Sequence, residues 1–199
     1  RGHGNSQDDV PGTPQDYWVR GLDDRDTYFY RGAYLDCIRA VSFLCSLNNV
    51  DQERIAVWGA SQGGGFALAT AALDTRVDLC VADIPFLCNW TNYFKLTQWD
   101  EMDKWLDQKQ HRSWSSALKT MSYFDTMNLC ERVTCPTIMS IGLQDQICPP
   151  TTGFAAFNRI KGTKIYTIYP SRGHGLGKDH QQHTWRQIKE QFTAAAGNQ

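Results

Sequence analysis

Apolar positions along the chain follow helical spacing in some segments and form short strand-like runs in others. Over residues 27–48 they recur at steps of about three or four residues, which predicts a helix. Short apolar runs bounded by turn residues predict four strands, the first two buried on both faces. The strands are expected at residues 55–58, 79–82, 137–142 and 164–169, with further helices at 63–73, 152–160 and 184–194.

The order of these elements predicts the fold class. Strands that alternate with helices imply right-handed crossovers, and therefore an α/β fold with a mostly parallel sheet and helices on both faces. Residues 1–26 are polar and rich in Asp, Gly and Pro, so a loop is expected there. Residues 86–125 interrupt the alternation, and helical spacing of their Trp and Met side chains predicts a helical, lid-like insertion over the carboxyl ends of the strands. We expect a single domain over residues 1–199.

Composition excludes several classes of partner. The chain has 199 residues with 20 basic and 21 acidic side chains, so no charge excess indicates binding to nucleic acid or to an anionic membrane. No apolar run approaches the roughly 20 residues that span a bilayer. The seven cysteines have no metal-ligand spacing, and several lie within apolar runs. They are interpreted as reduced, buried thiols of a cytoplasmic protein, although a disulfide between some pair stays open.

A candidate nucleophile stands between a predicted strand and a predicted helix. Gly59-Ala60-Ser61-Gln62-Gly63 matches the pattern G-x-S-x-G, which in this context forms a tight turn that exposes the serine. Both flanking glycines are expected to be required because the turn leaves no room for side chains. Ser61 is therefore predicted to be the nucleophile, with the backbone N–H of Gln62 facing a developing oxyanion.

An acid and a base follow in the order that this fold requires. Asp145 comes just after the third predicted strand and His174 just after the fourth, and open α/β sheets bind ligands at these carboxyl ends. Taken singly, each residue has an ordinary alternative role, as a turn aspartate or as a surface histidine. Together with Ser61 they predict a catalytic triad. Asp83, which follows the second strand, is the alternative acid.

A metal site is not predicted. His180 and His183 have metal-like spacing, but no Glu or Cys accompanies them on that segment. We expect both side chains on the solvent face near the final helix, and we expect neither a metal nor a cofactor.

Longer segments give a more specific resemblance. The chain resembles carbohydrate esterase family seven, the acetyl xylan esterases and cephalosporin C deacetylases. The resemblance rests on residues 59–65, 81–88, 122–125, 127–129, 142–145, 147–150 and 154–160. Two family signatures differ here: Arg-Gly-Gln is replaced by Arg1-Gly2-His3, and the His-Glu pair by His174-Gly175. These departures concern the surroundings of the site and hence substrate preference.

The resemblance implies a function and a larger protein. It implies an α/β-hydrolase that removes acetyl groups from xylan, xylo-oligosaccharides, cephalosporin C or other small esters, and a ring-like homo-oligomer. It also implies that strands preceding residue 1, and with them the second oxyanion donor, belong to the N-terminal third of a family member. Two alternatives stay open: a serine peptidase of the same fold and a non-catalytic binding protein.

Overall fold

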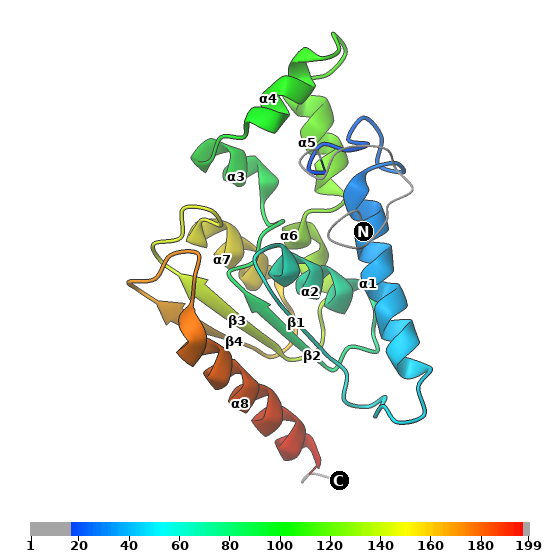
Figure 1. The fold of residues 1–199 in the computed structure, drawn as a ribbon, viewed down its shortest axis with the longest axis vertical. Coiled ribbons are helices and arrows are strands. Elements are labelled where there is room, and N and C mark those ends of the chain that lie inside the picture. The colour runs from blue at the N-terminus through cyan, green and yellow to red at the C-terminus, as the bar shows by residue number, and fades with distance from the viewer. Residues whose placement is uncertain (1–16, 197–199) are drawn as a thin grey trace.

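The protein is built around a parallel four-stranded sheet. The computed structural model describes residues 17–196, and Figure 1 shows the sheet with helices packed on both sides. The strand order follows the chain, β1-β2-β3-β4, and every neighbouring pair is parallel. This arrangement confirms the predicted fold class. The strands are β1 (Ala56–Ala60), β2 (Leu79–Asp83), β3 (Thr137–Gly142) and β4 (Lys164–Tyr169).

Side chains that alternate along the strands pack against different helices. Cys80 and Ala82 of β2 belong to a core formed with α1 (Phe29–Cys45), α2 (Gln62–Leu73) and α7 (Pro150–Arg159). Leu79 and Val81 point to the opposite face and pack against Ile188 and Phe192 of α8 (Gly177–Ala196). The alternation arises because successive side chains of a strand leave opposite faces. Figure 1 shows α8 apart from the other helices, on its own side of the sheet.

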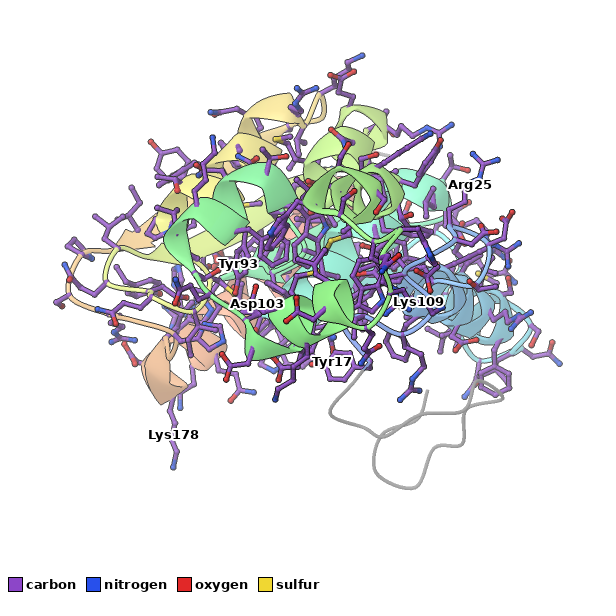
Figure 2. All side chains as sticks on the ribbon, turned by 90° about the horizontal axis from the view of Figure 1, so that it is seen from above. Tyr17, Arg25, Tyr93, Asp103, Lys109 and Lys178 are labelled. Atoms are coloured by element: carbon purple, nitrogen blue, oxygen red, sulfur yellow. The ribbon has the colours of Figure 1, made fainter. Side chains whose placement is uncertain are left out.

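A group of short helices caps the molecule. The segment between β2 and β3 carries α3 (Trp90–Leu96), α4 (Asp100–Asp107) and α5 (Trp114–Ser122), and it returns through α6 (Thr126–Leu129) and the 3₁₀ helix η2 (Cys130–Arg132). Figure 1 shows α3, α4 and α5 together at the top, beyond the sheet. Figure 2 looks down onto this cap, with Tyr93 and Asp103 near the middle of the view and Lys178 projecting at the rim.

Asp125 ties the two ends of this insertion together. Its carboxylate accepts the backbone N–H groups of Asn89 at 2.7 Å and of Trp90 at 2.8 Å, where the insertion begins. It also accepts the N–H of Met127 and so caps α6, where the insertion ends. Burial raises the pKa of this carboxyl group. The core can accommodate this buried carboxyl group because three backbone N–H groups donate to its oxygens.

Two predictions about these elements are wrong. The first strand was expected to be buried on both faces, but the side chains of β1 are only partly buried. Within residues 17–196, β1 pairs only with β2 and therefore lies at the sheet edge. The final helix begins at Gly177 and not at Thr184. The sequence pattern missed residues 177–183 because they are polar and carry no apolar periodicity. In the described part of the chain, no helix is long and apolar enough to cross a bilayer.

Candidate active site

Ser61 occupies a strained turn between β1 and α2. Its backbone angles are φ 58° and ψ −120°, a conformation that costs a non-glycine residue about 1–3 kcal/mol. Neighbouring backbone groups hold it in place. The Ser61 N–H donates to the carbonyl of Asp83 at 2.9 Å, and the Ser61 carbonyl accepts the N–H of Phe86 at 2.8 Å. The end of β2 and the segment after it thus fix the position of this serine.

Only one of the two glycines that flank the serine is required by packing. A Cβ at Gly59 would lie 2.4 Å from the carbonyl of Gly63, a contact that no side chain can make. A Cβ at Gly63 would meet nothing within 4 Å. The expectation that both glycines are sterically required is therefore wrong for Gly63. The close packing is therefore at Gly59, where the backbone of Gly63 in the first turn of α2 fills the space that a Cβ would need.

Asp145 and His174 lie against each other at the carboxyl ends of β3 and β4. His174 Nδ1 is 2.9 Å from Asp145 Oδ2 and 3.2 Å from Oδ1. Asp145 Oδ1 also accepts the backbone N–H groups of Ile147 at 2.9 Å and of Cys148 at 2.8 Å. The Asp145 side chain is fully buried, whereas that of His174 is 27% exposed. The turn therefore holds the carboxylate in contact with the Nδ1 side of the imidazole.

The serine hydroxyl is adjacent to a thiol in this structure. Ser61 Oγ lies 3.9 Å from Cys148 Sγ, and ligand atoms of Asp145, Cys148 and His174 all lie within 4.8 Å of one another. Within residues 17–196, no hydrogen bond joins Ser61 to His174. Catalytic hydrogen bonds are often long without substrate and tighten in the complex. The structure thus pairs the predicted acid with the predicted base and places both in one cluster with Cys148, beside Ser61.

Gln62 begins α2, so its backbone N–H is one of the first donors of the helix, which have no partner within the helix. Its side chain is also anchored, because Gln62 Nε2 donates to the Tyr30 hydroxyl at 3.0 Å. Burial raises the pKa of Tyr30 well above its usual value, so this hydroxyl stays neutral. The departure at Arg1-Gly2-His3 lies outside the described residues.

Comparison with known proteins identifies the family. The profile of acetyl xylan esterase (AXE1) matches residues 1–192. The chain belongs to the acetyl xylan esterase family. Acetyl esterase Axe7A of Xylanibacter ruminicola is 37% identical over 158 residues, which cover 79% of this chain and 36% of Axe7A.

Two solved acetyl xylan esterases have the same fold. The enzyme from Paenibacillus sp. R4 superposes with a TM-score of 0.83 at 39% identity, over 93% of this chain and 59% of that enzyme. The enzyme from Thermoanaerobacterium sp. JW/SL YS485 superposes with a TM-score of 0.85 at 31% identity, over 94% of this chain and 62% of that enzyme. The chain therefore spans less than two thirds of the length of each of these three relatives.

The cavity in front of Ser61 has aromatic walls. It encloses about 350 Å³ and is lined by residues from the N-terminal part, the turn at Ser61, the cap and the turn after Asp145. Its lining residues are Tyr17, Trp18, Ser61, Gln62, Phe86, Tyr93, Trp99, Glu101, Ile147 and Cys148. Trp18 and Trp99 pack with ring centroids 4.5 Å apart, which joins the N-terminal part to the cap. A cavity of this kind fits a small ligand with apolar faces and a few polar groups.

A second histidine–aspartate pair lines a cavity together with His174 and corrects the expectation for His180. This side chain is buried and not on the solvent face; its Nε2 lies 3.0 Å from Asp83 Oδ1, without the alignment of a hydrogen bond. Its Nδ1 is 2.9 Å from the Tyr169 hydroxyl, and Trp58 Nε1 donates to Asp83 Oδ2 at 2.7 Å. The alternative acid, Asp83, thus contacts a different histidine. His183, in contrast, is exposed.

His174 and His180 both line a further cavity of about 550 Å³ between β1 and α8. Helical spacing gave no sign of the His180 contact, because Asp83 and His180 lie far apart in the sequence. At Cys148 the sequence predicts only a small buried side chain. In the structure its thiol lies 3.9 Å from Ser61 Oγ and clusters with Asp145 and His174. Among residues 17–196, Asp145, Cys148 and His174 are the one group of side chains arranged to hold a metal ion.

Proposed function

We propose that this chain carries the catalytic centre of a serine acetyl esterase. Ser61 Oγ attacks the acetyl carbonyl while His174 Nε2 accepts its proton, and Asp145 stabilises the imidazolium through Nδ1. The Gln62 N–H donates to the oxyanion. His174 then protonates the departing alcohol. In the second half, His174 takes a proton from water as the water attacks the acetyl-enzyme, and it returns that proton to Ser61 Oγ as acetate leaves. The observation that carries the proposal is the 2.9 Å contact between Asp145 and His174 beside the strained Ser61.

We further propose acetylated xylan, xylo-oligosaccharides, cephalosporin C or other small acetyl esters as substrates. Family membership and the aromatic cavity support this choice. Aromatic faces such as Trp18 and Trp99 suit the apolar face of a sugar ring, and Glu101 at the same cavity can accept hydrogen bonds from sugar hydroxyls. The cap would act as the lid of this cavity, because Tyr93 and Trp99 form part of its wall.

The nucleophile is tested in the full-length protein. Ser61→Ala should abolish labelling by a fluorophosphonate and reduce hydrolysis of 4-nitrophenyl acetate to the residual rate, about 10³–10⁴-fold above water, that binding and the oxyanion donors leave. Ser171→Ala, an exposed serine on the loop before His174, is the matched control and should keep both properties. An active, unlabelled wild type would refute the assignment of Ser61.

The substrate class is tested by comparing acetyl esters with longer acyl esters and with peptide amides at equal enzyme concentration. Preference for acetyl esters supports the proposal, whereas faster cleavage of amides would indicate the peptidase alternative. Labelling of Ser61 without turnover of any ester would indicate a binding protein.

Two properties of the whole protein are also proposed. All seven cysteines are free, which supports a reducing, cytoplasmic compartment. The family resemblance supports a homo-oligomer. Cell fractionation tests the compartment, and analytical ultracentrifugation of the full-length protein tests the oligomer.

A further inference from the structure

We propose that Asp145, Cys148 and His174 form an inhibitory binding site for a thiophilic divalent cation, with Zn²⁺ as the best-fitting ion. The site lies within the proposed catalytic centre but has a different chemistry, because it uses a thiol that ester hydrolysis does not require. Binding of the cation does not depend on whether the chain hydrolyses acetyl esters.

The geometry of the three side chains fits a zinc ion. Their ligand atoms all lie within 4.8 Å of one another. Bonds of about 2.0–2.3 Å from sulfur, nitrogen and oxygen in a tetrahedron place ligand atoms about 3.3–3.8 Å apart, so the ligand atoms that lie farthest apart need to close by about 1.5 Å at most. Ser61 Oγ lies 3.9 Å from Cys148 Sγ, so the serine is next to one of the three ligands. A thiolate, an imidazole and a carboxylate are the ligand types that zinc prefers over magnesium or calcium.

The charges of the site also favour a cation. The Asp145 side chain is fully buried and Cys148 is 5% exposed, so a carboxyl group and a thiol share one buried site. When a cation binds, the Sγ–H bond of Cys148 breaks, a bond from sulfur to zinc forms, and the proton leaves to solvent. One carboxylate, one thiolate and neutral His174 then balance the two positive charges of zinc, so the buried site becomes neutral. No change of oxidation state is involved.

The cation has a route to the site. Cys148 and Ser61 both line the aromatic cavity, and His174 is 27% exposed. Glu101 lines the same cavity and favours the approach of a cation over that of an anion.

Binding removes the general base whichever ring nitrogen of His174 is used. If Nε2 binds zinc, the lone pair that would take the Ser61 proton is occupied. If Nδ1 binds zinc, the ring proton moves to Nε2, which can then no longer accept the serine proton. The cation and the acetyl ester also compete for the same cavity.

Metal binding is tested directly in the full-length protein. Calorimetric titration with Zn²⁺ should give one equivalent per chain, and Co²⁺ should give the absorption band of cobalt bound to thiolate. Cys148→Ser and Cys148→Ala should each abolish the band and raise the Kd for Zn²⁺ by more than about 100-fold, since even loss of an outer partner of a metal site costs about 10–100-fold. Cys45→Ser, a half-buried thiol on α1, is the matched control and should bind as the wild type does.

The outcomes separate this inference from the proposed function. Absence of one-to-one zinc binding, or a cobalt–thiolate band that persists in both Cys148 variants, overturns the inference. A band that depends on Cys148 supports it even if no ester is hydrolysed. In an active enzyme, Zn²⁺ should inhibit at the concentrations that fill the site, and a chelator should restore the rate. Binding at this site without inhibition would refute the regulatory part of the proposal.

Discussion

Asp145→Asn is expected to remove catalysis while leaving the fold intact. Asp145 Oδ1 accepts two backbone N–H groups, and Oδ2 contacts His174 Nδ1 at 2.9 Å. An asparagine can keep the two backbone hydrogen bonds through its one oxygen, which turns its NH₂ group toward Nδ1. The imidazole must then accept at Nδ1 and carry its proton on Nε2, so it cannot take the proton of Ser61. Loss of the correct tautomer in a triad costs about 10⁴ in kcat, which corresponds to about 5.4 kcal/mol.

The assay is steady-state hydrolysis of 4-nitrophenyl acetate by the full-length protein, with urea unfolding measured in parallel. The free energy of unfolding should change by about 1 kcal/mol or less, because the turn keeps its hydrogen bonds. Asp83→Asn is the matched control. Its partner is His180 and not His174, so kcat should stay within about tenfold of the wild type. The reasoning is refuted if Asp145→Asn keeps kcat within tenfold, and a loss of about 10⁴ in Asp83→Asn would assign the acid to the second pair.

Three further predictions concern the glycines of the Ser61 turn, the pH dependence of stability, and the Tyr30 hydroxyl that contacts the Gln62 side chain. Gly59→Ala should destabilise the fold by about 1–3 kcal/mol, because its Cβ meets backbone at 2.4 Å. Gly63→Ala, which meets nothing, should stabilise α2 by up to about 1 kcal/mol; urea unfolding measures both. Asp23, paired with Arg112, has its pKa lowered from 3.8 to about 2, so its stabilising contribution is present above pH 3.8 and is lost as the pH falls toward 2. In Asp23→Asn, the urea midpoint should vary less with pH over that window. Tyr30→Phe removes the hydroxyl that anchors the side-chain amide after the nucleophile and should lower kcat by about tenfold or less with little change in KM. Stronger effects on KM would contradict the positioning role.

Local pattern was sufficient to predict the architecture. Short apolar runs separated by helical stripes predicted the four parallel strands; for β2 and β3 the reason is that a strand covered on both faces needs apolar side chains on both. The same pattern predicted where chemistry should gather. Carboxyl ends of parallel strands meet at one edge of a sheet, so Ser61, Asp145 and His174 could be assigned to one edge before any distance was known. Their catalytic roles stay predictions that the variants above address.

Burial at the sheet edge and contacts between distant segments were not contained in local pattern. The apolar run of β1 resembles a central strand, and only the strand order places it at the edge of the described sheet. His180 lies in a polar segment that predicts exposure, yet the fold brings it against Asp83 and Tyr169.

The sequence by itself thus determined the order of elements and the residue types at each strand end, because periodicity and turn chemistry act over a few neighbouring residues. Tertiary structure alone decided which histidine faces which aspartate. It also decided that the thiol of Cys148 stands 3.9 Å from Ser61. Such pairings depend on strand register and on helix position across the sheet, and no local spacing along the chain encodes either of them.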